Sequence, residues 1–471
     1  MSIFARKDFK MEKLTEFVSA HINDDPSKLL LARSKWPEID MDLAVNCIES
    51  RRKLKGKVKE WYDNPALVFP AKLSAEQCSS SATGFYKASL AGKIGKRIAD
   101  LTGGLGVDSW FFAKVADEVL YNEMQTRLCD AARHNFDALG VGNIRISNHA
   151  VGNGLDESSP AALLTEFAPD LVFMDPARRG EGGKKVFLIE ECTPDVLTLK
   201  DEIFGICRHM LIKLSPMADI TMVCSRLGRT CREVHVVATG GECKELLIWM
   251  DREWNDEYTV HAVELPHEYP SSCTTINSSC PTVNSSCTTI NSSCPTINSS
   301  CPTVNSSCPT VNSSCPTPIG HLSEFTFLPS EEHTAVQYAS TPSTPARPEF
   351  IFEPGKALMK AGAFNLISTK FGITKLGKST HYYTFDSRET AESLTPLGKV
   401  YRIMTWEPLD KRSIKAAGKA FPKAEVTARN IPMDTDTLRK KLGITSGDDA
   451  HIFGLKSDKL GNLLLCCQRV F

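Results

Sequence analysis

The chain contains a glycine-rich segment of the kind that holds a small ligand. Residues 100–108 read Asp-Leu-Thr-Gly-Gly-Leu-Gly-Val-Asp, after a short apolar run and before a stretch with helical spacing. Glycine lets a backbone turn tightly and approach a ligand with no Cβ in the way. We therefore expect this segment to cradle a cofactor between a strand and a helix. Its glycines are Gly103, Gly104 and Gly106.

The spacing within this segment distinguishes between cofactors. A dinucleotide site has a further glycine three residues after its Gly-x-Gly pair, and Ser109 stands there instead. The pattern Asp-x-x-x-Gly-x-Gly, which begins at Asp100, favours S-adenosylmethionine. The methionyl ammonium and carboxylate of that cofactor need an acid and backbone groups rather than a phosphate cradle. Asp100 and Asp108 are the acids that we expect around it.

Two later segments supply the rest of the expected cofactor site. Residues 118–123 read as a strand that ends in Glu123, at the spacing where an acid takes the ribose hydroxyls. Residues 143–149 read as a third strand, and we expect its end, Asn148 and His149, near the adenine. A glycine loop in some other α/β domain is the alternative interpretation.

We expect the substrate side of the site at the end of a fourth strand. Residues 170–175 are too apolar for a surface strand and end in Asp175, whose carboxylate can accept a proton or hydrogen bond from an attacking amine or hydroxyl. Pro176 fixes the backbone beside it. Arg178 and Arg179 either grip a base or phosphate of the substrate or are solvated, and the sequence leaves both interpretations open.

The strands and helices that must position these residues alternate along the chain. A helix expected at residues 124–139 separates the second strand from the third. Such alternation predicts an α/β fold with a parallel, doubly wound, Rossmann-like sheet and ligands at the carboxyl ends of its strands. We expect this domain at residues 91–255, after a helical N-terminal region at residues 1–90.

Composition narrows the class of protein. The chain has 471 residues, enough for two or three domains, and its net charge of −1 gives no long-range attraction for a charged partner. Residues 1–13 lack the apolar core of a signal peptide and no run reaches the length of a membrane span, so we expect a cytoplasmic protein without membrane contact. A basic stretch at residues 51–59 indicates either a nucleic-acid contact or a solvated helix face.

A seven-residue repeat, S-S-C-[PT]-T-[IV]-N, fills residues 271–317. It holds seven of the chain's 17 cysteines, and its prolines and polar residues favour neither a helix nor a packed core. We interpret residues 268–320 as a low-complexity linker. A metal-binding array is the alternative, but single cysteines seven apart lack the paired spacing of zinc ligands, and we expect no metal in this chain.

The chain after the repeat predicts a smaller α+β part. A strand is expected at residues 349–355 and one helix at residues 357–371. From residue 394 to the end, strand and helix patterns alternate, with fourteen basic residues against eight acidic ones. This excess indicates an RNA-facing surface, with an ordinary solvated surface as the alternative.

Together these motifs resemble those of bacterial class I S-adenosylmethionine-dependent methyltransferases with a C-terminal THUMP-like domain, which are found widely in Bacteroidetes. The similarity covers nearly the whole chain outside the repeat. It lies in the segments LSAEQCSSSATGFYK (73–87), LTGGLGVDS (101–109), 121–135, MDPARR (174–179), GECKEL (241–246), Glu353-Pro354 and ARNIP (428–432). It implies a ferredoxin-like segment at residues 345–393 and a THUMP-like domain at residues 394–471, and it implies that this domain binds structured RNA such as tRNA or rRNA.

The expected function follows from these residues and this resemblance. We expect a methyltransferase that uses S-adenosylmethionine to modify a nitrogen or oxygen of an RNA nucleotide, with Asp175, Pro176 and Arg178 at the acceptor. Carbon methylation is disfavoured, because the strand after the Asp-Pro strand ends at residues 212–216 without a cysteine nucleophile. The alternatives are a methyltransferase for a small molecule or a protein, and a non-catalytic RNA-binding adaptor.

Overall fold

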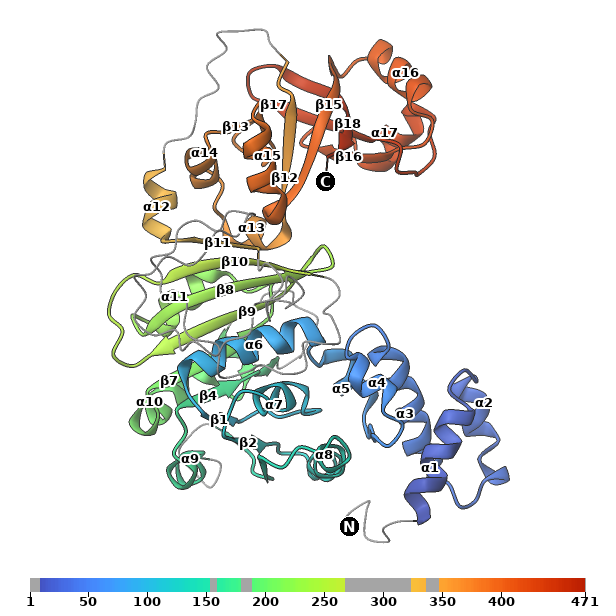
Figure 1. The fold of residues 1–471 in the computed structure, drawn as a ribbon, viewed down its shortest axis with the longest axis vertical. Coiled ribbons are helices and arrows are strands. Elements are labelled where there is room, and N and C mark those ends of the chain that lie inside the picture. Colours follow the sequence, from blue (N-terminus) through green and yellow to red (C-terminus); the bar gives the residue numbers. More distant parts are fainter. Residues whose placement is uncertain (1–8, 153–158, 179–188, 267–322, 336–346, 471) are drawn as a thin grey trace, which may run out of the picture.

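The computed structural model describes residues 9–152, 159–178, 189–266, 323–335 and 347–470. The predicted repeat linker and Arg179 lie outside the described residues. The N-terminal region is helical, as predicted, and lies at one end of the molecule (Figure 1). Its helices are α1 (Phe9–Ala20), α2 (Pro26–Leu31), α3 (Met41–Leu54), α4 (Lys59–Asp63) and α5 (Lys72–Gln77), with a short 3-10 turn at Arg33–Lys35.

Within the described residues, nine strands form one sheet in the order β11-β10-β8-β9-β7-β4-β1-β2-β3. The strands are β1 (Arg97–Asp100), β2 (Glu118–Asn122), β3 (Ile144–Ser147), β4 (Leu171–Met174), β7 (His209–Leu214), β8 (Cys231–Thr239), β9 (Glu242–Asp251), β10 (Thr259–Leu265) and β11 (Ser323–Phe327). The run from β3 to β7 is parallel, as predicted. The rest is mixed, because β9 and β11 run antiparallel to their neighbours.

Helices cover both faces of this sheet, which explains why the central strand β4 is apolar throughout. Along β4, Leu171 and Phe173 join the core under one set of helices, whereas Val172 and Met174 join the core under the other. The first set is α6 (Ser81–Ile94), α7 (Val107–Phe112) and α8 (Thr126–Ala138). The second is α9 (Ala161–Phe167), α10 (Val196–Ile206) and α11 (Ile220–Leu227).

A second sheet forms the other end of the molecule (Figure 1). Its order is β13 (Thr374–Lys375), β14 (Tyr383–Phe385), β12 (Phe350–Pro354), β15 (Gly398–Pro408), β18 (Gly461–Arg469), β17 (His451–Ser457) and β16 (Glu425–Arg429). Its helices, with the preceding α12 (Pro329–Thr334), are α13 (Lys356–Ala361), α14 (Leu366–Phe371), α15 (Arg388–Leu394), α16 (Lys411–Ala420) and α17 (Thr435–Leu442). Because β12 pairs with β15, one sheet runs through both segments expected after the repeat.

The prediction of a single helix at residues 357–371 is wrong. The structure has two helices there, α13 and α14, because Gly362 adopts φ +85° and ends the first one. A left-handed glycine directly after a helix satisfies its last carbonyl groups and turns the chain away from the helix axis.

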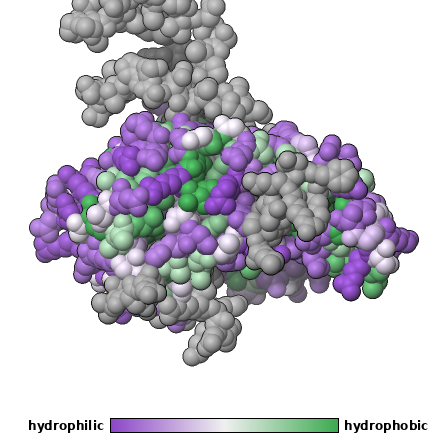
Figure 2. All heavy atoms as spheres, turned by 90° about the horizontal axis from the view of Figure 1, so that it is seen from below, coloured by the Kyte–Doolittle hydropathy of each residue, from purple (hydrophilic) through white to green (hydrophobic). Residues whose placement is uncertain are grey.

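Three further pieces are short. The strands β5 (Ala177–Arg178) and β6 (Cys192–Thr193) pair with each other, and 3-10 turns occupy Ile189–Glu191 and Thr395–Leu397. Figure 2 shows the molecule from below, where hydrophilic residues cover most of the surface and hydrophobic ones gather in small areas near its middle. In the part of the chain that the structure describes, every helix is too short or too polar to cross a bilayer.

Candidate cofactor and acceptor site

A cavity of about 250 Å³ lies where β1, β2 and β4 end. Residues 74–79 form one wall of it through Ser74, Gln77, Cys78 and Ser79. Residues predicted for the site that line the cavity are Gly103, Gly104, Gly106, Asp108, Glu123, His149 and Asp175. Asp100, Asn148 and Pro176 do not line it, and the side chain of Arg178 lies outside what the structure describes.

The glycine loop packs too closely for larger residues. A Cβ at Gly103 would lie 2.2 Å from Cε2 of the buried Tyr121 ring. Gly104 and Gly106 adopt φ values of +55° and +92°, a region that residues with a Cβ rarely enter. The Tyr121 hydroxyl donates to Gly104 O at 2.6 Å. The loop is therefore held against β2, with its backbone facing the cavity.

Asp100 lies beneath the loop and is 1% exposed. Its carboxylate accepts hydrogen bonds from Ser109 Oγ at 2.6 Å and from the Thr102 amide at 3.0 Å. Desolvation raises the pKa of Asp100 to about 7. These contacts tie the start of the loop to α7, so Asp100 supports the loop from below and does not line the cavity.

Glu123 connects the two loops that meet at the cavity. Its Oε2 accepts from the Gly104 amide at 3.0 Å and its Oε1 from the Gln125 amide at 2.8 Å. Each carboxylate oxygen has two lone pairs, so both can accept another donor. Asn148 supports this arrangement from behind, because its Nδ2 donates to Glu123 O at 2.7 Å.

Asp175 is paired with Lys213, a residue that the sequence analysis did not select. Lys213 lies on β7, and its ammonium donates to Asp175 Oδ2. Burial lowers the pKa of Lys213, but attraction to Asp175, Asp108 and Glu245 outweighs burial and raises it above its usual value. The signal in the sequence was a lysine within the apolar run His209–Leu214, since a buried charge requires a partner.

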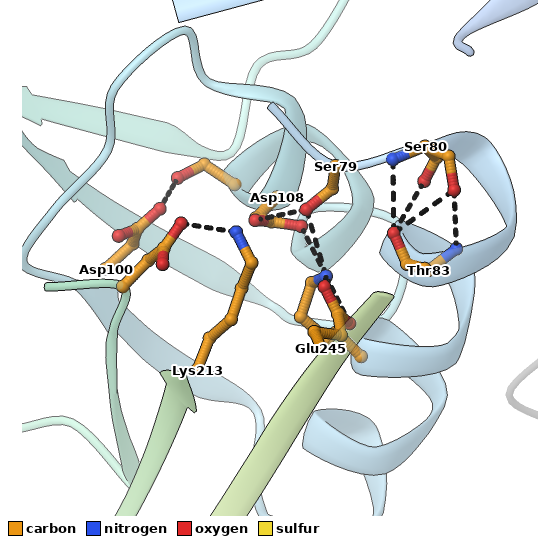
Figure 3. A network of polar contacts seen from close by, with 10 residues as sticks. Ser79, Ser80, Thr83, Asp100, Asp108, Lys213 and Glu245 are labelled. Carbon is orange, nitrogen blue, oxygen red and sulfur yellow. Dashed lines mark hydrogen bonds and ion pairs between the residues drawn. The ribbon is translucent and has the colours of Figure 1, made fainter. Parts of the chain in front are cut away.

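A buried network adjoins this pair (Figure 3). Lys87, which is 0% exposed, donates to both carboxylate oxygens of Glu245 at 2.7 and 2.8 Å and to Ser79 Oγ at 2.9 Å. Ser79 in turn donates to Asp108 Oδ2 at 2.8 Å. Asp108 therefore joins the wall of the cavity to helix α6, where Lys87 lies, and to β9, where Glu245 lies.

A second cavity of about 530 Å³ adjoins the first. The two share Gln77, Cys78 and Ser79 in their linings. Asp175 lines the first cavity and Lys213 lines the second. The Asp175–Lys213 ion pair thus stands between the two cavities.

Cys78 lines both cavities, so its thiol is relevant to the expectation that the protein does not methylate carbon. Its Sγ donates to Ala75 O at 3.3 Å, and burial raises its pKa. A nucleophilic cysteine needs the opposite, a lowered pKa that favours the thiolate. The environment of Cys78 therefore does not activate it.

The basic stretch at residues 51–59 makes contacts within the protein. Arg51 is buried and donates to the carbonyl oxygens of Tyr62, Pro65 and Leu67 at 2.7 to 3.1 Å. Arg52 donates to the Ile22 carbonyl at 2.7 Å. These two arginines fasten the N-terminal helices together. Buried Arg51 fits neither interpretation, whereas Arg52, Lys53, Lys55 and Lys59 are exposed, as the solvated-face interpretation expects.

Comparison with known proteins gives matches over the C-terminal part and over the whole chain. Residues 350–390 match the model of a ferredoxin-like domain family, and residues 398–469 that of a THUMP domain-like family. The whole chain is similar to a "putative methyltransferase" from Porphyromonas gingivalis W83, with 25% identity, 98% of each chain covered and a TM-score of 0.74. No curated protein matches the chain.

Two smaller structures match about a third of the chain. One is an rRNA methylase from Streptococcus thermophilus, with 11% identity, a TM-score of 0.26 and coverage of 35% of this chain and 94% of that one. The other is a "putative methyltransferase" from Streptococcus mutans in complex with SAH, with 12% identity, a TM-score of 0.25 and coverage of 35% and 95%. At such scores these similarities carry no conclusion.

Fold and cavity together define an α/β protein of the methyltransferase type, with a Rossmann-like sheet and a C-terminal THUMP-like domain. The resemblance inferred from the sequence is thereby confirmed, since the Porphyromonas protein is a Bacteroidetes chain that shares this fold from end to end.

Proposed function

We propose that this protein transfers a methyl group from S-adenosylmethionine to a nitrogen or oxygen of an RNA nucleotide. The observation that carries the proposal is the Asp175–Lys213 pair between the two cavities, next to a glycine loop and a carboxylate arranged for a nucleoside. The RNA part rests on the THUMP-like match and on the basic helices α16 and α17.

The residues present fit S-adenosylmethionine. A Cβ at Gly103 or Gly106 would meet a buried aromatic ring within 3 Å, so only glycine at these positions lets the loop keep its conformation beside the cavity. Glu123 keeps acceptor capacity for the two ribose hydroxyls, and His149 and Leu128 line the side where the adenine is expected. We propose that Asp100 acts through the loop and that Asn148 acts through Glu123. When bound, the cofactor supplies an electrophilic methyl group on a sulfonium ion.

Asp175 would receive the acceptor. Its carboxylate is held by Lys213, so one oxygen is engaged and the other can accept a hydrogen bond from the attacking amine or hydroxyl. This contact would orient the acceptor's lone pair toward the methyl group, and orientation is a large part of the acceleration of a displacement reaction. Pro176 fixes the backbone that carries Asp175.

The cofactor part of the proposal is tested by calorimetry with S-adenosylhomocysteine. Glu123→Gln should weaken binding about tenfold or more, because hydrogen bonds to a charged group are worth roughly 1.5–3 kcal/mol. Glu118→Gln is the matched control, since Glu118 begins β2, the strand that Glu123 follows, and pairs with Arg97 at the far end. Equal affinity of both folded variants would place the ribose elsewhere.

The transfer part is tested with RNA from a strain that lacks the gene, followed by mass spectrometry of its nucleosides. The wild type should add a methyl group to one nucleoside, whereas Asp175→Asn should bind S-adenosylhomocysteine normally and transfer about 10²- to 10⁴-fold more slowly. Transfer to a protein or small-molecule fraction instead of RNA would reject the RNA substrate. Normal transfer by Asp175→Asn would reject the role of Asp175.

A further inference from the structure

A cluster of two histidines and one glutamate lies on the first sheet, outside both cavities. Glu233 and His235 are two residues apart on β8, so their side chains leave the same face of the sheet. His261 on β10 is the direct partner of His235 in the parallel register. The candidate ligand atoms of the three residues all lie within 4.8 Å of one another.

One inward-facing nitrogen of this cluster is satisfied and the other is not. His235 Nε2 shares a hydrogen bond of 3.2 Å with Glu233 Oε2, whereas His261 Nε2 lies 3.6 Å from the same oxygen. The His261 nitrogen is buried and makes no hydrogen bond to any described residue. A buried polar atom without a hydrogen-bond partner is unfavourable, which indicates that a ligand binds there. Imidazole and carboxylate are both metal ligands, and a cation would satisfy all three side chains.

The outward nitrogen of each imidazole is already engaged. His235 Nδ1 lies 2.8 Å from the Tyr86 hydroxyl of α6, and His261 Nδ1 lies 2.5 Å from Glu324 Oε1 of β11. In metal sites, the second nitrogen of a ligating histidine almost always donates to such an outer partner, which fixes the tautomer and aims the free nitrogen at the metal. The cluster therefore has both the inner and the outer contacts of a metal site.

We propose that Glu233, His235 and His261 bind a divalent transition-metal cation, with Zn²⁺ as the ion that suits two imidazoles and one carboxylate. The rings are now stacked, with centroids 4.4 Å apart and planes 13° from parallel. Binding requires them to tilt until both Nε2 lone pairs converge, and water completes the tetrahedron. Glu233 and His261 are 20% and 16% exposed, which gives the ion a route in.

The role of this site is structural. It joins β8 to β10, and through Glu324 it reaches β11, the edge strand of the first sheet. The expectation of no metal rested on the cysteines of the repeat. The signal for this site is the pattern Glu-x-His at residues 233–235, and the third ligand lies 26 residues further along the chain.

The test compares zinc retained by full-length variants, because thiols can also take up added zinc, the chain has 17 cysteines, and only a difference between variants identifies this site. Protein stripped with EDTA is reloaded with Zn²⁺, desalted and measured by elemental mass spectrometry and thermal unfolding. The wild type should keep one equivalent more than His261→Gln or Glu233→Gln, and zinc should raise its Tm more than theirs. His209→Gln should behave as wild type. His209 is the matched control, being also 16% exposed and 4.0 Å from one carboxylate, that of Asp251.

Equal zinc content in the wild type, Glu233→Gln and His261→Gln would overturn the proposal. So would an equal loss in His209→Gln, because that loss would be unspecific. If His261→Gln does not fold, as judged by circular dichroism, Glu233→Gln decides the question, since glutamine keeps an oxygen in contact with His235 while removing the anionic ligand.

Discussion

The carboxyl group of Asp100 is buried beneath the cavity, and its surroundings change its protonation. Desolvation raises its pKa from an ordinary 3.8 to about 7. The negative charges of Asp108 and Asp175 add to this rise, and the hydrogen bonds from Ser109 and Thr102 oppose it. The folded protein then keeps this proton up to about pH 7, whereas the unfolded chain releases it near pH 4. The stability that Asp100 contributes is therefore fully present below pH 4 and lost as pH rises through 7.

We expect Asp100→Asn to remove this pH dependence. The wild type should lose stability relative to the variant between pH 4 and 7, by at most about 4 kcal/mol at roughly 1.4 kcal/mol per pKa unit. Urea unfolding of both proteins without cofactor, at several pH values, measures the difference. Asp137→Asn, a change at an exposed position of α8, serves as the control. A difference between wild type and Asp100→Asn that stays constant with pH would contradict the buried, protonated state.

At the scale of the element, we expect the glycines of the loop between β1 and α7 to differ in how much stability is lost when each is replaced by alanine. Gly104 needs glycine only for its φ of +55°, since no atom lies closer than 3.8 Å to a Cβ built there. Gly103→Ala would instead drive a methyl group into the Tyr121 ring, which is 0% exposed and cannot move aside. Gly104→Ala should therefore cost about 1–2 kcal/mol of stability, and Gly103→Ala distinctly more. Thermal unfolding of the two variants ranks them, and a larger loss for Gly104→Ala would show that strain outweighs the close packing.

At the scale of the whole molecule, positive charge gathers on the C-terminal domain while the net charge of the chain is −1. Helices α16 and α17 pack on one core and expose lysines at positions 411, 415, 419, 440 and 441, with Arg412 beside them. Arg439 differs, because it is 28% exposed and pairs with Asp436. A surface that binds phosphates should use the exposed lysines rather than Arg439.

Replacing Lys415, Lys419, Lys440 and Lys441 by Gln should weaken RNA binding across sequences and reduce the slope of log Kd against log salt by up to about 3. The reason is that a variant with fewer phosphate contacts releases fewer counterions from the RNA when it binds. Filter binding at several salt concentrations measures the slope, and affinity for S-adenosylhomocysteine should not change. The charge-matched control replaces four exposed cations at the other end of the molecule: Lys28, Arg33, Lys35 and Lys55. An unaltered slope would make α16 and α17 an ordinary solvated surface.

Local sequence determined the parts of this protein that depend on neighbours in the chain. Residues 100–108 predict a tight loop through glycine alone, and the apolar run to Asp175 predicts a strand buried on both faces, because turn chemistry and hydrophobic period are local properties. The order of these motifs then predicts a parallel sheet with Glu123 and Asp175 at one edge, which the structure has. The split at Gly362 was missed, since helical spacing continues across a glycine and only its backbone conformation ends the helix.

Tertiary structure alone decided which charges meet. Lys213 contacts Asp175, 38 residues away in the chain, because strand order brings them together. Lys87 contacts Glu245, 158 residues away, because α6 packs on the sheet. Strand register places His261 beside His235. The structure also puts Asp100 below the cavity rather than in its lining. Asp100 is the last residue of β1, whereas Glu123 and Asp175 each follow the last residue of their strands. Pairings of this kind depend on distances in space that the spacing of residues along the chain does not contain.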